Sequence, residues 1–220
     1  MKHYILLFAS ALILCSCSQQ FTRASLYPKM YEEKPTTILI MPPINNTNHA
    51  EAKDYFYSSL SMPLTEKGYY VVSPFLSSDL LKQESAYDSE MFINGSLAPF
   101  RNVFGADAVL FTTINKWEKQ SGLNYIKVGI DYALKSTKTG EILFNRSGEL
   151  TVNFSSGGNN GLLGLALDMI ATAAADKIIA ARRCNLYVLQ DLPEGLYGRE
   201  FDKDQNVKAG KPEFKGTIKK

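Results

Sequence analysis

The stretch "YIKVGIDYALKSTKTGEILF" constrains the fold of this 220-residue chain more than any other segment. Between residues 125 and 136, apolar side chains occupy one phase of a strict alternation: Ile126, Val128, Ile130, Tyr132 and Leu134. The opposite phase carries Lys127, Asp131 and Lys135, so this strand has one buried face and one face in water. A turn at Thr139 and Gly140 and an even-numbered apolar series from Ile142 to Phe154 then predict a long hairpin.

Shorter segments before the hairpin predict alternating strands and helices. Apolar runs indicate strands at residues 36–41, 69–73 and 106–117, the last of them central in the sheet because it is almost continuously apolar. Helical spacing predicts helices at residues 48–67 with a break at Pro63, at 77–85, at 97–104 and at 162–183. The expected fold is a single α/β domain over residues 35–197, with a mixed five-stranded sheet flanked by helices. Its first strands form right-handed β-α-β units, and the others form an antiparallel meander.

The N-terminus has the layout of a secretory signal peptide. Lys2 and His3 precede an apolar run from Tyr4 to Leu14, and small and polar residues follow. The run has about ten residues, whereas a bilayer-spanning helix needs roughly 20. Signals of bacterial lipoproteins resemble this segment, with Leu14 at position −3 and Ser16 at −1 before Cys17. We therefore expect a signal at residues 1–16 and a diacylglycerol on Cys17; the alternative is ordinary cleavage near Ser16 or Ser18.

Two further features of that resemblance bear on location. Ser18 after the cysteine resembles the default signal for the outer membrane, which predicts a lipid-anchored protein with its domain in the periplasm. Three acyl chains, palmitate among them, would hold the protein firmly, because each buried methylene contributes about 0.8 kcal/mol. Residues 17–34 show no periodicity and are expected to be a tether.

Charge and cysteine content exclude some classes of protein. Loss of Lys2 with the signal lowers the formal net charge from +2 to +1, so no nucleic-acid partner is indicated. With Cys15 removed and Cys17 acylated, Cys184 is the last free thiol, so no intramolecular disulfide can form. Cys184 is expected to be a small buried apolar residue, or alternatively to form an intermolecular bridge. Residues 198–220 carry seven basic and four acidic side chains, and their polar composition predicts a disordered, Lys-rich tail.

Candidates for a chemical site are few. The loop after the first strand offers Asn45, Asn46, Thr47 and His49 as weak ligand-binding residues, at a place where open α/β sheets often bind ligands. His49 with Glu51 and Asp54 is a poor metal site because a second soft ligand is missing, and capping of the helix start is favoured. The "SSGGNNG" stretch lacks the Gly-Lys-Ser/Thr ending of a nucleotide loop, so it predicts a connection. No enzyme, cofactor or metal is expected.

The last predicted helix offers the better candidate contact. It is apolar around most of its circumference, which is more surface than packing on a sheet is expected to cover. Asp168, Asp176 and Lys177 oppose insertion into a membrane. The side chains expected to meet a subunit or partner are Leu163, Leu167, Ile170, Ala174 and Ile178.

Four segments together resemble a family of bacterial lipoproteins of unknown function, best known through a vaccine-candidate surface antigen: "TTILIMPPINNTN", "KGYYVVSP", "FGADAVLFTTINKW" and "DYALKSTKTGEILF". More distantly, the chain resembles the periplasmic domain of curli-secretion channel lipoproteins and the N-terminal domain of TolB-type proteins. That resemblance implies an α/β domain that assembles with its own copies or with envelope transport proteins, and it implies no catalytic residues. The pore-forming channel lipoproteins contribute long amphipathic membrane hairpins, which are not expected here because the turn centred on Thr139 and Gly140 is tight and one strand face carries Lys or Glu.

The expected function is that of a structural or regulatory subunit in a cell-envelope secretion or transport assembly, anchored in the outer membrane. The alternative is a periplasmic ligand-binding or catalytic protein that uses the loop after the first strand.

Overall fold

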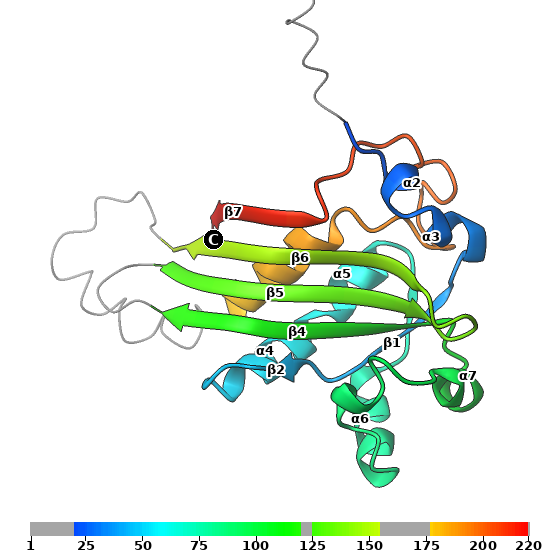
Figure 1. The fold of residues 1–220 in the computed structure, drawn as a ribbon, viewed down its shortest axis with the longest axis horizontal. Helices are drawn as coiled ribbons and strands as arrows, with labels where there is room; N and C mark the ends of the chain where they lie inside the picture. The colour runs from blue at the N-terminus through cyan, green and yellow to red at the C-terminus, as the bar shows by residue number, and fades with distance from the viewer. Residues whose placement is uncertain (1–19, 120–124, 155–176, 220) are drawn as a thin grey trace, which may run out of the picture.

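The computed structural model describes residues 20–119, 125–154 and 177–219. They form an α/β domain around one mixed sheet of seven strands in the order β3-β1-β4-β5-β6-β7, with β2 paired to β4 (Figure 1). The predicted fold class is confirmed. The predicted count of five strands is wrong, because β2 and β7 also join the sheet.

The antiparallel half of the sheet is the predicted meander. It consists of β4 (Ala108–Lys119), β5 (Tyr125–Ser136) and β6 (Ile142–Asn153). All five apolar side chains that define the alternation in β5 are at most 2% exposed. Gly140 closes the β5–β6 turn with a φ of 74°, a conformation that glycine adopts at little cost. Ile142 departs from the expected apolar face and is 51% exposed, because the register shifts between Leu134 and Lys135 beside the turn.

The parallel half is built on β1 (Thr37–Ile40), which lies between β3 (Tyr70–Val71) and β4. The β4 strand is therefore interior, as its apolar sequence predicts. After β1 the chain passes through Pro42 and Pro43 and then pairs again with β4 as β2 (Ile44–Asn45). Proline has no N–H to donate in a sheet, so Pro42 and Pro43 interrupt the pairing with β4. The pairing resumes at β2 and is therefore interrupted and not ended there.

Helices cover the two faces of the sheet unequally. Their bounds are α2 Arg23–Leu26, α3 Pro28–Glu33, α4 Glu51–Ser59, α5 Ser61–Glu66, α6 Pro74–Gln83, the 3₁₀ turn η1 Ser89–Met91, and α7 Ala98–Phe104; residues 177–189 are also helical. The predicted break near Pro63 is confirmed, since Pro63 lies in the first turn of α5, where its missing N–H is tolerated. Gly105 ends α7 in the left-handed conformation, as expected.

Two apolar clusters hold these layers together. The larger cluster lies between one face of the sheet and α3, α4, α5 and the 177–189 helix, with Phe56 and Trp117 packed edge to face at 5.7 Å. The smaller cluster joins α6 and α7 to the β1 and β4 side of the opposite face, around Leu39, Val109 and Phe100. The remaining part of that face, over β4 to β7, lies open toward the viewer in Figure 1.

Residues 20–34 are not the unstructured tether that the sequence suggests. Thr22 caps α2 in a reciprocal capping box with Ser25, and α3 follows directly. Tyr27 and Met30 are 2% and 4% exposed, and the Tyr27 ring lies 4.6 Å from the ring of Phe144. Each helix is too short for an apolar period to show, so tertiary packing decides their structure.

The predicted disorder of residues 198–220 is also wrong for residues 198–219. This segment wraps around α2 and ends in β7 (Glu213–Lys219), which pairs in parallel with β6 (Figure 1). It is fixed at two buried points. Asp204 forms an ion pair with Arg23 at 2.6 Å, and the Gly210 amide donates at 3.1 Å to Asp191, which pairs with Arg146 at 2.9 Å. The polar composition of this segment predicts disorder because the few contacts that hold it in place are with residues distant in sequence.

The last helix continues beyond its predicted end at Arg183, since residues 177–189 are helical. Cys184 therefore lies inside the helix, and it is fully buried, as expected of a small apolar residue. Burial raises the pKa of its thiol. In the part of the chain described by the structure, no helix has the length and apolarity needed to cross a membrane.

Candidate functional site

The loop after β1 brings Asn45, Asn46, Thr47 and His49 together, as the sequence predicts, but its polar groups bind one another. The Asn45 side chain accepts hydrogen bonds from the Thr47 amide and hydroxyl at 3.1 and 2.8 Å. Its amide donates to the His49 carbonyl at 2.9 Å. This is an Asx turn that closes the loop on itself, so these groups hold the loop in shape instead of pointing toward a ligand.

The suggested metal ligands are also committed elsewhere. His49 Nδ1 lies 3.7 Å from Glu51, and Lys177 donates to the same carboxylate oxygen at 2.6 Å. The hydrogen bond from Lys177 holds the pKa of Glu51 below its usual range. Within residues 20–119, 125–154 and 177–219, no three His, Cys, Asp or Glu side chains gather in a way that could hold a metal ion. Glu51 therefore links α4 to the last helix.

A shallow hollow of about 250 Å³ lies between this loop and the end of β4. Asn46 donates across it to Asn115 at 3.0 Å, and both side chains are exposed. The hollow has polar walls, and its described lining residues could hold water or a peptide group by hydrogen bonds.

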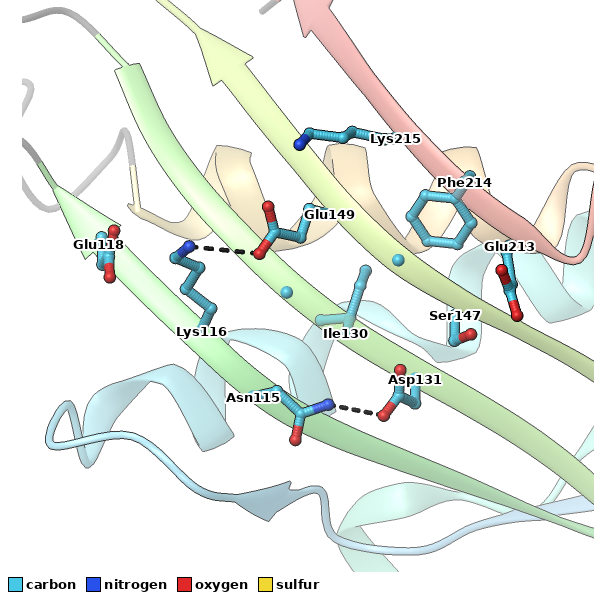
Figure 2. A pocket seen from close by; sticks show the side chains of 12 residues that line it. Asn115, Lys116, Glu118, Ile130, Asp131, Ser147, Glu149, Glu213, Phe214 and Lys215 are labelled. Carbon is cyan, nitrogen blue, oxygen red and sulfur yellow. Dashed lines mark hydrogen bonds and ion pairs between the residues drawn. The ribbon is translucent and has the colours of Figure 1, made fainter.

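A wider groove of about 770 Å³ runs over the open face of β4 to β7 (Figure 2). It crosses β5 at Gly129, where an added Cβ would lie 2.9 Å from the Cβ of Lys116. The absent side chain lets Lys116 reach over β5 to Glu149 at 3.2 Å, and Asn115 donates to Asp131 at 2.6 Å. The groove is wide and polar, so it is suited to a shallow polar contact and not to a deep ligand pocket.

A third hollow is apolar and lies between α6 and α7. Its volume is about 470 Å³, and it is lined by Leu80, Leu81, Glu84, Ala86, Phe92, Pro99, Phe100, Val103 and Phe104. The floor is formed by Leu81 and Phe100, which are 2% and 3% exposed. Val103 stands on the rim with 61% of its surface exposed. Both helices project from the sheet on the side of β1 (Figure 1).

Exposed apolar side chains continue from this groove along α6 and η1. Phe75, Leu76 and Met91 are 75%, 67% and 65% exposed, and Leu76 lies one helical turn before Leu80. Single exposed apolar residues are ordinary, whereas contiguous exposed apolar patches are typical of interaction surfaces. We call Phe75, Leu76, Met91, Val103 and the groove the α6–α7 surface.

Sequence reasoning missed the α6–α7 surface. The available signal was the adjacent pair Phe75 and Leu76 at the start of a short helix, two large apolar side chains in its first turn. The contact predicted for the last helix instead falls mostly outside the described residues: Leu163, Leu167, Ile170 and Ala174. The remaining member, Ile178, is 39% exposed, while Ala181, Cys184 and Val188 on the same helix are fully buried.

Residues 26–187 match the family model described as "Putative lipoprotein GNA1162-like". The chain belongs to the GNA1162-like lipoprotein family. This confirms the family resemblance seen in the sequence, and it supports a membrane-anchored protein of the cell envelope. A relative in Neisseria meningitidis serogroup B, "Putative lipoprotein NMB1124/NMB1162", is 26% identical over 180 residues, which are 81% of this chain and 83% of the relative.

Solved structures are similar to parts of this GNA1162-like chain. Lipoprotein GNA1162 from Neisseria meningitidis is 25% identical, with a TM-score of 0.49 over 64% of this chain and 99% of that protein. A PelC dodecamer from Paraburkholderia phytofirmans is 15% identical, with a TM-score of 0.47 over 73% of this chain and 90% of that protein. Cys17 lies outside the described residues, so its acylation stays a prediction from the sequence.

Proposed function

We propose that this GNA1162-like protein is a structural or regulatory subunit of a secretion or transport assembly, anchored in the outer membrane through a diacylated Cys17. The proposed role is not enzymatic. It binds a protein partner, a second copy or another envelope protein, through the α6–α7 surface. The predicted contact on the last helix is kept as an additional surface around Ile178.

One observation carries this proposal: the α6–α7 surface combines an apolar groove of about 470 Å³ with exposed side chains on its rim. Removing apolar area from water stabilises an association by roughly 25 cal/mol per Å² before ordering costs are subtracted. The occupant that fits is an apolar helix or loop of a protein, because the groove is open and poor in polar groups. Glu84 is the charged residue among its lining side chains.

The other hollows support this assignment by their chemistry. In the loop hollow, the Asn45 side chain is already bound to Thr47 and to the His49 carbonyl. The sheet-face groove is polar, and two contacts, Lys116 with Glu149 and Asn115 with Asp131, already cross it. A ligand-binding or catalytic role at Asn45, Asn46, Thr47 or His49 would need those pairs to open first. No specific contact favours that alternative.

Photocrosslinking in living cells tests the partner surface. A photoreactive phenylalanine at Val103 should give a defined crosslinked species, and the same residue at Asn102, its exposed neighbour on α7, should give much less. Mass spectrometry of the product distinguishes a second copy from another envelope protein. Monomer alone at Leu76, Met91 and Val103 would rule the surface out as the contact.

Membrane anchoring needs its own test. Labelled palmitate should enter the wild-type protein and the Cys15→Ala variant and should be absent from Cys17→Ala. Fractionation should then place the wild-type protein in the outer membrane. The reverse labelling pattern would contradict lipid attachment at Cys17.

A further inference from the structure

The first described residues of the chain are joined to its last segment. Thr22 forms a β-bridge with Lys208. The Ala209 amide donates to the Phe21 carbonyl at 2.8 Å, and the Arg23 amide donates to the Val207 carbonyl at 2.9 Å. Residues 208–219 therefore begin beside the point where the chain leaves the domain toward Cys17.

The distance from that point to Cys17 is short. Four residue steps separate Phe21 from Cys17, and a fully extended chain covers at most about 3.6 Å per residue, so the span is at most about 14 Å. The sequence predicted a tether of residues 17–34, which would have let the domain move far from a membrane. Because α2 and α3 are packed into the domain, that freedom is lost.

Residues 208–219 carry a concentrated positive charge. Lys208, Lys211, Lys215 and Lys219 are all exposed, and Glu213 is the one acidic residue among these twelve. The chain from Cys17 onward has a formal charge of only +1, so this concentration does not reflect the composition as a whole. We call these twelve residues the lysine edge.

The lysine edge lies along a border of the sheet. The β7 strand pairs with β6 on one side, and in the described part of the chain no strand pairs with its other side. Figure 1 shows β7 as the red strand at this border, with its first residues near α2 and the departing N-terminal chain. Lys215 also rises over the open sheet face in Figure 2.

We propose that the lysine edge lies against the anionic headgroups of the membrane that holds the protein, and so sets the orientation of the domain. The inference rests on a lipid at Cys17. A short anchor brings the lysine edge close to the membrane surface. This closeness matters because salt screens the attraction between lysines and headgroups over a Debye length of about 8 Å. The binding energy that one basic residue gains near an anionic leaflet corresponds to about a fivefold gain in affinity, so each lysine should strengthen the contact by about that factor.

Lysines on an edge strand have a second possible role, which the test must separate. They prevent pairing with strands of other molecules, and this role requires no membrane. In that case the charge would act through solubility alone, and the lysines would stay open to reagents at every lipid composition.

The test couples the chain from Cys17 to Lys220 to vesicles through a maleimide lipid at the Cys17 thiol. Cys184 is fully buried and its pKa is raised, so it leaves Cys17 as the reactive thiol. This coupling does not use natural acylation, so a failure here is distinct from a failure of palmitate labelling. Acetylation rates of single lysines are then measured by mass spectrometry on phosphatidylglycerol vesicles and on neutral phosphatidylcholine vesicles.

We expect Lys208, Lys211, Lys215 and Lys219 to react at least about fivefold more slowly on phosphatidylglycerol than on phosphatidylcholine. Lys82, exposed on α6, should react equally on both. The double variant Lys215→Glu/Lys219→Glu should remove the protection of Lys208 and Lys211. The matched control Lys82→Glu/Lys138→Glu makes the same charge change and should keep it.

Two results would overturn the proposal. Equal rates on both vesicle types would show that the edge does not contact anionic headgroups. Protection that rises with protein density and ignores lipid charge would instead assign the edge to contact with a second copy.

Discussion

Arg146 should be one of the most sensitive positions for stability, because it joins three parts of the fold. Its guanidinium is 1% exposed and forms an ion pair with Asp191 at 2.9 Å. It donates to the carbonyl oxygens of Tyr187 and Val188 at 3.0 Å and of Lys211 at 3.5 Å. It therefore connects β6, the end of the last helix and the segment that leads into β7.

The substitution Arg146→Met keeps an unbranched side chain and removes every one of these donors. Asp191 would then remain largely buried without its cationic partner. It would keep the hydrogen bond that the Gly210 amide donates to it at 3.1 Å. Breaking a buried pair by removing one partner costs about 3–5 kcal/mol. Since domains of this size have a free energy of unfolding of about 5–15 kcal/mol, the variant should lose a large part of its stability.

Urea unfolding followed by circular dichroism measures this loss, and hydrogen exchange of the β7 amides shows whether β7 opens first. The matched control is Lys116→Met on the same sheet, which breaks the pair with Glu149, whose side chains are 32% and 49% exposed. Exposed pairs contribute about 0–1 kcal/mol, so the control should unfold almost like the wild type. If both variants lose the same small amount, the structural role assigned to Arg146 is refuted.

Tyr27, Cys184 and Gly148 supply the smaller predictions. Burial raises the pKa of Tyr27 to about 12, so between pH 10 and 12 the folded state keeps a proton that the unfolded state loses. The free energy of unfolding should therefore fall as the pH rises from about 10 to 12. The fall should be smaller in Tyr27→Phe, which has no phenolic proton to lose. The Tyr27 hydroxyl has no hydrogen-bond partner among the described residues, so Tyr27→Phe should keep or slightly raise the melting temperature at pH 7. A thiol reagent should label Cys184 only after urea unfolds the Cys17→Ala variant, and fast labelling of the native variant would contradict its burial. Gly148→Ala should weaken the attachment of β7, seen as faster hydrogen exchange there, because φ is 156° and a Cβ would lie 1.9 Å from the Phe214 carbonyl oxygen.

The α6–α7 surface shows why a contact site is harder to predict than a strand. Val103 and Phe100 are both apolar residues of one short helix, yet one is 61% exposed and the other 3%. The difference in their exposure depends on the position of α6, which is distant from them in the sequence. The Asn45 loop gives the opposite case, where the sequence located the polar groups correctly and only the structure shows them bound to one another.

The sequence by itself determined the meander, the interior position of β4, the break before Pro63 and the burial of Cys184, because each depends on periodicity, local backbone geometry or apolarity within a short window. The packing of residues 20–34 and the pairing of β7 were decided only by the tertiary structure. Their stabilising contacts include the ion pair of Arg23 with Asp204 and the hydrogen bond from Arg146 to the Lys211 carbonyl, which join residues 181 and 65 positions apart, and no local pattern encodes such a pairing.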